Sequence, residues 1–85
     1  MFYVYVLKSI KDGKLYNGYT ANLKARLLMH NRKKVASTKN RAPFNLIYYE
    51  AFLHQQDATA REKFFKTQWG GNFLQKVLKN YFRDA

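Results

Sequence analysis

The chain has 85 residues, and its 16 lysines and arginines against five acidic residues give a formal net charge of +11. Apolar residues make up 47% of it, which suits one domain with a modest core, expected over residues 1–85, and excludes a disordered chain. The absence of cysteine excludes disulfides and thiolate zinc sites. No segment has the length of a membrane span or the pattern of a signal peptide, so we expect a cytoplasmic protein without a membrane partner.

The charge also limits the class of partner. A folded chain this basic most often binds nucleic acid, with an acidic membrane or an acidic protein as the lesser alternatives. Solubility alone requires less charge in a domain of this size.

Three segments have the composition of strands. Phe2–Ser9 alternates with apolar residues on both faces, which predicts a central strand covered on both sides. Asp12-Gly13 predicts a hairpin turn into an antiparallel second strand, Leu15–Tyr19. A polar loop, Lys33–Pro43, precedes a third strand over Asn45–Leu53.

Three segments predict helices. The first covers Asn22–Lys33, with Thr20 or Asn22 as its cap. The second begins at Asp57, a good N-cap, and runs to about Trp69, where two glycines break it. The last carries an apolar stripe of Phe73, Leu74, Val77, Leu78 and Tyr81. The order β-β-α-β-α-α predicts an α/β domain of the α+β type, a three-stranded sheet flanked by helices.

Several side chains that can bind a phosphate lie in the second strand and the first helix. Arg26 and His30 are four residues apart and share a helix face, and Lys33 extends this stripe. The stripe borders the apolar face, so these side chains and Tyr16 could meet one phosphate. Gly18 lets another backbone or a ligand come close to the second strand.

Glu62 is the most informative of the five acids. Ala58, Phe65 and Trp69 share its side of the predicted helix, so it lies on or beside the buried face. The residue pattern alone favours an ion pair of Glu62 with Arg61 or another base. The functional alternative is a carboxylate that binds a hard divalent cation. Glu50 is expected to point from the third strand toward a lysine.

Several short segments, taken in order, resemble the GIY-YIG nuclease domain, and specifically its small stand-alone bacterial members. Tyr3-Val4-Tyr5 and Tyr16-Asn17-Gly18 stand where the two strand motifs would be, although the first lacks its glycine and Asn17 replaces a usual aliphatic residue. Arg26 and His30 fit the helix motif, and Arg61-Glu62-Lys63 fits the helix that carries the acid. The linking segments that also match are Ser37-Thr38-Lys39, Arg41-Ala42-Pro43, Leu46 to Glu50, Asp57-Ala58, Lys66-Thr67 and Trp69-Gly70.

The resemblance implies hydrolysis of a nucleic-acid phosphodiester, with DNA favoured, by means of one divalent metal, Mg²⁺ or Mn²⁺, held by Glu62. Tyr16, together with Tyr5, would position or deprotonate the attacking water, a role for which nearby positive charge must lower the phenol pKa. Arg26 would stabilise charge on the phosphate, and His30 would assist Tyr16 or the phosphate. Lys33, Lys39 and Arg41 are the expected nucleic-acid contacts.

Other interpretations remain open at this point. The tyrosines could simply fill the sheet, His30 could be a favourable charge at a helix C-terminus, and Lys39 and Arg41 could belong to a solvated loop. The protein could also be a nucleic-acid-binding module that does not cleave. A basic protein-interaction domain is a third alternative, but it accounts for none of the set Tyr16, Arg26 and Glu62.

Overall fold

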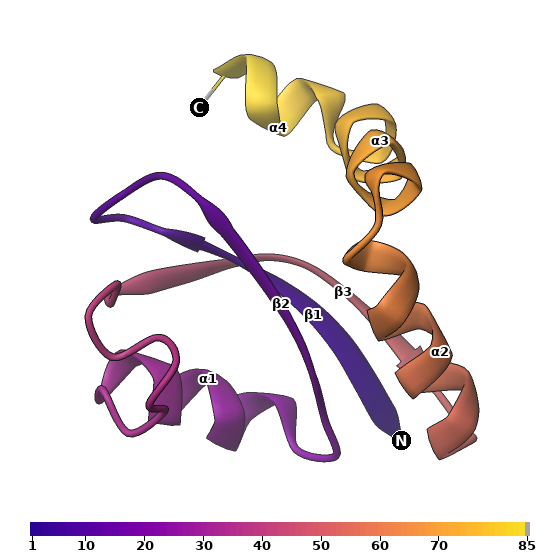
Figure 1. Ribbon diagram of the computed structural model, residues 1–85, viewed down its shortest axis with the longest axis horizontal. Helices are drawn as coiled ribbons and strands as arrows, with labels where there is room; N and C mark the ends of the chain where they lie inside the picture. Colours follow the sequence, from indigo (N-terminus) through magenta and orange to yellow (C-terminus); the bar gives the residue numbers. More distant parts are fainter. Residues whose placement is uncertain (85) are drawn as a thin grey trace.

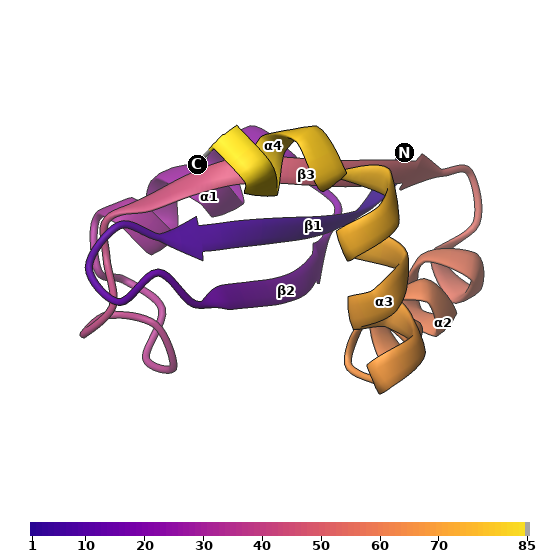
Figure 2. The same ribbon diagram turned by 90° about the horizontal axis from the view of Figure 1, so that it is seen from above.

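The computed structural model describes residues 1–84 and confirms the predicted fold class. Its elements are β1 (Phe2–Ser9), β2 (Leu15–Thr20), α1 (Leu23–Asn31), β3 (Phe44–Phe52), α2 (Gln55–Phe65), α3 (Gln68–Val77) and α4 (Lys79–Asp84). The strands form one antiparallel sheet in the order β2-β1-β3, and Figure 2 shows β1 between its two neighbours. Within residues 1–84 no helix combines the length and the hydropathy that crossing a bilayer requires.

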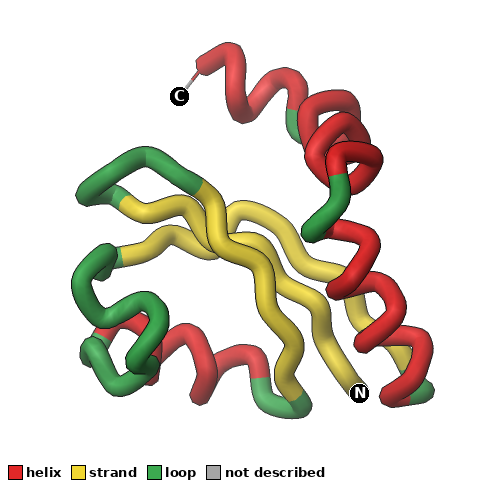
Figure 3. Tube along the Cα trace, in the orientation of Figure 1, coloured by secondary structure: helices red, strands yellow, loops and turns green. Residues whose placement is uncertain are grey.

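Helices cover both faces of the sheet, as the sequence of β1 predicts. Figures 1 and 3 show α1 on one side of the sheet, with α2 and α3 on the other. Val4 and Val6 are fully buried in the cluster toward α2 and α3, whereas Tyr5 and Leu7 are buried in the cluster toward α1. Successive side chains of a strand point to opposite faces, so the unbroken apolar run over the first six residues of β1 requires cover on both sides.

The strand register places Tyr5 and Tyr16, the two motif tyrosines with a predicted catalytic role, on one face of the sheet. Tyr5 lies opposite Gly18, and Leu7 lies opposite Tyr16. Residues opposite each other in a sheet share a face, so Tyr16 is a diagonal neighbour of Tyr5 on the α1 side. The predicted hairpin turn is present, and Gly13 has the left-handed φ of +73° that this turn requires.

The first helix is capped as predicted but ends earlier. The Asn22 side chain accepts a hydrogen bond from the Ala25 amide at 3.1 Å. The helix ends at Asn31, and Lys33 follows with a left-handed φ of 61°. The prediction that Lys33 extends the stripe of Arg26 and His30 is therefore wrong, because the chain has already turned out of the helix.

The apolar face of α1 is formed by Leu23 and Leu27, which pack against the core cluster of the α1 side. Met29 is 41% exposed and does not belong to this face.

The second helix differs from prediction at both ends. His54, not Asp57, is its N-cap, and the His54 ring accepts from the Gln56 amide at 3.1 Å. The helix stops at Phe65, and Thr67 caps a new helix by accepting from the Gly70 amide at 3.3 Å. Trp69 thus belongs to α3 and does not share a helix face with Glu62.

The two glycines lie inside α3 and do not break a helix. A Cβ at Gly70 would collide with the backbone of Phe64 and Phe65, so glycine is needed there for a close approach between α3 and α2. Sequence signals cannot separate this use of glycine from a helix stop, because the approaching backbone is defined only by the fold.

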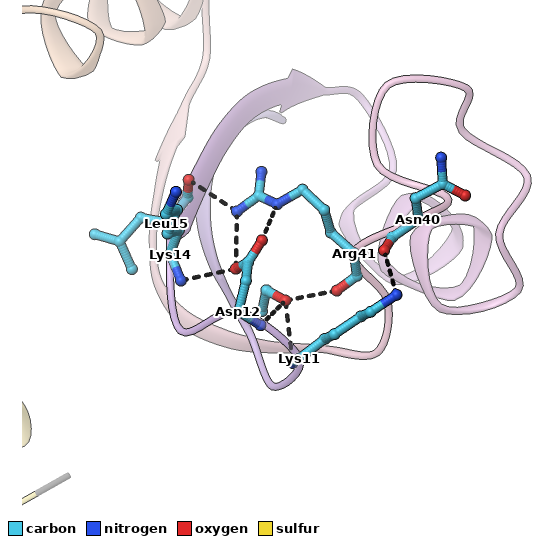
Figure 4. A network of polar contacts seen from close by, with 7 residues as sticks. Lys11, Asp12, Lys14, Leu15, Asn40 and Arg41 are labelled. Carbon is cyan, nitrogen blue, oxygen red and sulfur yellow. Dashed lines mark hydrogen bonds and ion pairs between the residues drawn. The ribbon is translucent and has the colours of Figure 1, made fainter.

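The long loop before β3 is fastened at its end to the β1–β2 turn, as Figure 4 shows. Arg41 forms an ion pair with Asp12 at 2.8 Å, and Lys11 donates to the Asn40 carbonyl at 3.1 Å. The buried Ser9 hydroxyl donates to the Arg41 carbonyl at 2.6 Å. These contacts fix the end of the loop against the β1–β2 turn. Thr38, earlier in the loop, is fully buried.

Candidate active site

A buried chain of polar contacts joins β1, α1 and the loop. The Tyr5 hydroxyl lies 2.8 Å from His30 Nε2, and His30 Nδ1 lies 2.7 Å from the Thr38 hydroxyl. All three side chains are at most 1% exposed. The hydrogen-bonding capacity of both ring nitrogens is therefore used inside the protein, as a buried imidazole requires.

Burial determines the protonation of this chain. It lowers the pKa of His30 to about 4, with the positive charge of Arg26 as a second cause, so the imidazole is neutral at pH 7. Burial also raises the pKa of Tyr5, an effect that the neighbouring Arg26 opposes without reversing it. A protonated Tyr5 donates to Nε2, which assigns the ring proton to Nδ1 and directs it to Thr38.

Tyr16 lies at the outer side of this chain. Its ring packs edge-on against His30, with 5.2 Å between ring centroids. In the described part of the chain its hydroxyl makes no hydrogen bond to protein, and the side chain is half-buried. Of the two motif tyrosines, Tyr16 is thus the one whose hydroxyl is free for a substrate or a water.

Gly18 makes room for Tyr5. A Cβ at Gly18 would collide with the hydroxyl end of the Tyr5 ring across the β1–β2 pair. The sequence predicts a close approach at Gly18, but by a backbone or a ligand. The structure shows that a side chain of the protein itself occupies this space.

Arg26 contributes a buried donor that the protein does not satisfy. Its Nε atom is buried and has no hydrogen-bond partner among the described residues. Leaving a charged donor unpaired in this way costs free energy, and a bound anion would recover that cost by supplying the missing acceptor. Arg26 influences both Tyr5 and His30 electrostatically, which places its charge beside the chain of polar contacts.

Glu62 reaches the same site from α2. Its charge acts on Tyr5, and its carboxylate lies 3.7 Å from the Lys66 ammonium. Lys66 also donates to the Asn17 side chain at 2.8 Å, and its ammonium lies 6.0 Å from the centroid of the Tyr16 ring. The Glu62 side chain is 26% exposed, so solvent and small ions can reach it.

Of the two predicted kinds of partner for Glu62, Arg61 or another base, the structure shows another base, Lys66. Arg61 binds Glu50 with two hydrogen bonds of 2.8 and 3.1 Å, and its guanidinium stacks on aromatic rings of α2 and α3. Glu50 therefore faces an arginine and not a lysine. Arg61 and Glu62 are adjacent in sequence and project from different sides of the helix, so Lys66, one turn further on, is the cation nearest to Glu62.

The structure thus brings five of the predicted residues to one place, from four separate elements: Tyr5, Tyr16, Arg26, His30 and Glu62. It does not add the predicted basic contacts to this cluster. Lys33 and Lys39 are exposed on the loop, and Arg41 is held by Asp12. Their role in nucleic-acid binding stays a prediction.

Sequence reasoning did not include three residues of the site. Thr38 orients His30, while Asn17 and Lys66 join β2 to the end of α2; Asn17 also donates to the Phe65 carbonyl at 3.3 Å. Asn17 had a signal, because it replaces an aliphatic residue in a strand. The other two have no local signal, since a threonine in a polar loop and a lysine on a helix are common.

Comparison with known proteins places this geometry in a family. The family model of the GIY-YIG catalytic domain matches residues 1–72. A UPF0213 protein of Pediococcus acidilactici is 46% identical over 82 residues, covering 93% of this chain and 82% of that protein. A UPF0213 protein of Clostridium perfringens is 43% identical over 85 residues, covering 99% and 90%.

A solved structure agrees with both the fold and the family. The solution NMR structure of a UPF0213 protein from Bacillus halodurans matches with a TM-score of 0.55 and 32% identity, over 91% of this chain and 85% of that one. The chain belongs to the GIY-YIG family of nuclease domains.

Proposed function

We propose that this protein is a metal-dependent endonuclease that hydrolyses phosphodiester bonds of nucleic acid, with DNA as the favoured substrate. The observation that carries the proposal is the convergence of a phenol, a guanidinium and a carboxylate on one buried Tyr-His pair. Filling the sheet would account for the tyrosines alone, but not for an unsatisfied arginine donor and an acid beside them.

The residues fit a metal ion whose coordination shell is completed by the substrate. Among residues 1–84 no three histidine, aspartate or glutamate side chains gather to hold an ion. Mg²⁺ needs only one or two protein carboxylates when phosphate oxygens and waters complete its shell, and Glu62 is an accessible carboxylate whose charge acts on Tyr5. When bound, the metal supplies Lewis-acid polarisation of the phosphate.

The protein side chains have separate tasks in this proposal. Arg26 donates from its unsatisfied Nε to a phosphate oxygen and stabilises the charge that develops there, an effect worth a few kcal/mol in comparable sites. The Tyr16 hydroxyl accepts a hydrogen bond from the attacking water and so orients it. The Lys66 ammonium, 6.0 Å from the centroid of the Tyr16 ring, adds a positive charge on the side of the phosphate.

His30 acts on structure and not on the proton of the water. Its two ring nitrogens are engaged by Tyr5 and Thr38, and it is neutral at pH 7. It holds Tyr5 in place and supports the Tyr16 ring from one side. Of the two implied roles, assisting Tyr16 or assisting the phosphate, this is the first.

A cleavage assay with a matched pair of arginine variants tests the proposal. Single-stranded, duplex and branched DNA and a single-stranded RNA are incubated with Mg²⁺, with Mn²⁺ and with a chelator. We expect metal-dependent cleavage by the wild type, its loss in Arg26→Ala, and its retention in Arg32→Ala, an exposed arginine at the end of the same helix. Binding without cleavage under all conditions would identify a nucleic-acid-binding module instead.

A further inference from the structure

Trp69 is the only tryptophan of the chain, and 73% of its surface is exposed at the start of α3. A single exposed apolar residue is ordinary on a protein surface. Trp69, however, borders a hollow of about 590 Å³, a volume within the usual range of small-molecule sites. The residues that line this Trp69 hollow are Phe64, Trp69, Asn72, Phe73, Gln75 and Lys76.

The position of Trp69 is rigid. Thr67 donates to the Phe64 carbonyl at 2.6 Å and caps α3 through the Gly70 amide. Gly70 packs directly against the backbone at the end of α2, where a Cβ would not fit. The ring is therefore carried on a fixed helix start, so little backbone freedom is lost when something stacks on it.

Charge decides which class of partner fits this surface. The segment from Lys63 to Phe82 contains four lysines and no acidic residue, and Lys76 is the one charged residue that lines the hollow. A polyanion is complementary to it, whereas a second copy of this chain would bring another +11 to the contact.

The lining combines three kinds of chemistry. Aromatic faces stack on the π-face of any base. The side-chain amides of Asn72 and Gln75 can both donate to and accept from the edge of a base, and an ammonium neutralises a phosphate. An acidic peptide would use the ammonium but leave the aromatic faces and the amides without a matching group.

The hollow is close to the candidate active site along the chain. Lys66, which contacts Asn17 of β2 and lies 3.7 Å from Glu62, precedes Trp69 by three residues. The start of α3 therefore adjoins the Lys66 side of the candidate active site.

We infer that the Trp69 hollow binds an unstacked nucleobase of the nucleic acid whose backbone lies in the candidate active site. Trp69 stacks on the base, Asn72 and Gln75 contact its edge, and Lys76 contacts its phosphate. This inference rests on the proposed function and adds a substrate class, namely nucleic acid with unpaired bases near the bond that is cut.

Trp69 fluorescence is a direct test, because no other tryptophan contributes. The protein is titrated in chelator with a single-stranded oligonucleotide, with the blunt duplex of the same length, and with polyglutamate. We expect saturable quenching by the single strand at the concentrations where fluorescence anisotropy reports binding, and much weaker quenching by the other two. Equal quenching by the duplex or by polyglutamate, or binding of the single strand without quenching, would overturn the inference.

Variants provide a second readout. Trp69→Leu should weaken single-strand binding about ten- to a hundredfold and duplex binding little, and Trp69→Phe, which keeps a ring, should lose less. Leu53→Ala, at an apolar side chain that is 87% exposed outside this hollow, is the matched control and should change neither. Thermal melting checks that each variant is folded. Unchanged single-strand affinity in a folded Trp69→Leu would also overturn the inference.

Failure of this inference and failure of the proposed function can be told apart. If the wild type cleaves DNA with metal while the single strand leaves Trp69 fluorescence unchanged, the Trp69 hollow is not a base site and the nuclease proposal stands. If oligonucleotides quench Trp69 but no metal supports cleavage, the base site stands and the nuclease proposal fails.

Discussion

The Tyr5 hydroxyl lies 2.8 Å from His30 Nε2, and both side chains are buried between the sheet and α1. This contact joins a residue of the first strand to one 25 positions later, and it turns two candidate catalytic groups into one internal hydrogen-bonded unit. It also divides the two motif tyrosines by task. Tyr5 is held inside the protein, whereas Tyr16 lies against the outer side of the same imidazole.

The two tyrosines should therefore respond differently to loss of their hydroxyl. Tyr5→Phe leaves the buried Nε2 of His30 without its partner, which should cost about 1–3 kcal/mol of unfolding free energy. Tyr16→Phe should change that free energy by less than about 0.5 kcal/mol but lower cleavage at least about a hundredfold. Urea unfolding and a cleavage assay on both variants give the measurement. A fully active Tyr16→Phe protein would remove Tyr16 from the mechanism.

Glu62→Gln separates metal binding from an ion pair. The pair with Lys66 is long and partly exposed, so its loss should cost less than about 1 kcal/mol and the fold should survive. Cleavage should vanish, while DNA binding should persist or tighten because a charge that repels phosphate is removed. Melting with and without Mn²⁺ is measured beside cleavage and binding.

Asp57→Asn, at an exposed acid in the first turn of the same helix, is the control for Glu62. It should keep full cleavage. Normal cleavage by Glu62→Gln would exclude the metal role and leave the binding module as the better interpretation.

Stability should fall in acid through His30. Its pKa is about 4 in the folded protein and 6.5 in a model peptide, so the unfolded state binds the proton first. The full contribution of the neutral ring is present above pH 6.5 and is lost as the pH falls toward 4, by up to about 3 kcal/mol. Urea midpoints across this range should show the loss.

Asp12 should contribute to the pH dependence of stability over a separate, more acidic range. Arg41 and backbone hydrogen bonds lower its pKa from 3.8 to about 2, so its contribution is lost only between those values. An NMR titration distinguishes the two groups. His30 signals that change near pH 6.5, in place of pH 4, would show that the ring is not buried in its neutral form.

Replacing Lys39 and replacing Arg41 should have different effects on stability. Lys39 is exposed, so Lys39→Gln should weaken DNA binding and flatten its dependence on salt, with stability unchanged. Arg41 is paired with Asp12 and stacks on Phe44, so Arg41→Gln should lower the melting temperature as well. Binding isotherms across a salt series, together with melting curves, give the comparison. A DNA affinity that does not vary with salt would contradict the nucleic-acid interpretation of the whole charge.

Gly18→Ala tests the space that Tyr5 occupies. The new methyl group must collide with the end of the Tyr5 ring, so Tyr5 or the β1–β2 pair has to shift. We expect a loss of about 1–3 kcal/mol in stability, as for other overpacked cores, together with slower cleavage. Gly71→Ala is the control, because a Cβ there meets no atom within 4 Å. Equal melting temperatures for the two variants would show that Gly18 is not a contact point.

The sequence by itself determined the sheet. β1 carries apolar residues at its first six positions, and the Asp12-Gly13 turn pairs it with the next strand, so local period and turn chemistry were sufficient to predict the three strands and the two-sided cover. The motif residues were also readable, because helical spacing puts Arg26 and His30 on one face. Family membership followed from these short segments in order, and the family comparison confirms it.

Only the tertiary structure decided which charged and polar groups meet. Glu50 pairs with Arg61, Glu62 lies nearest Lys66, and His30 contacts Thr38 from a loop whose sequence carries no signal for it. Gly70 marks a close approach between helices and not their boundary. Local patterns state which side of an element a residue occupies. Contacts between elements depend on how those sides pack, and that is fixed only when the whole core closes.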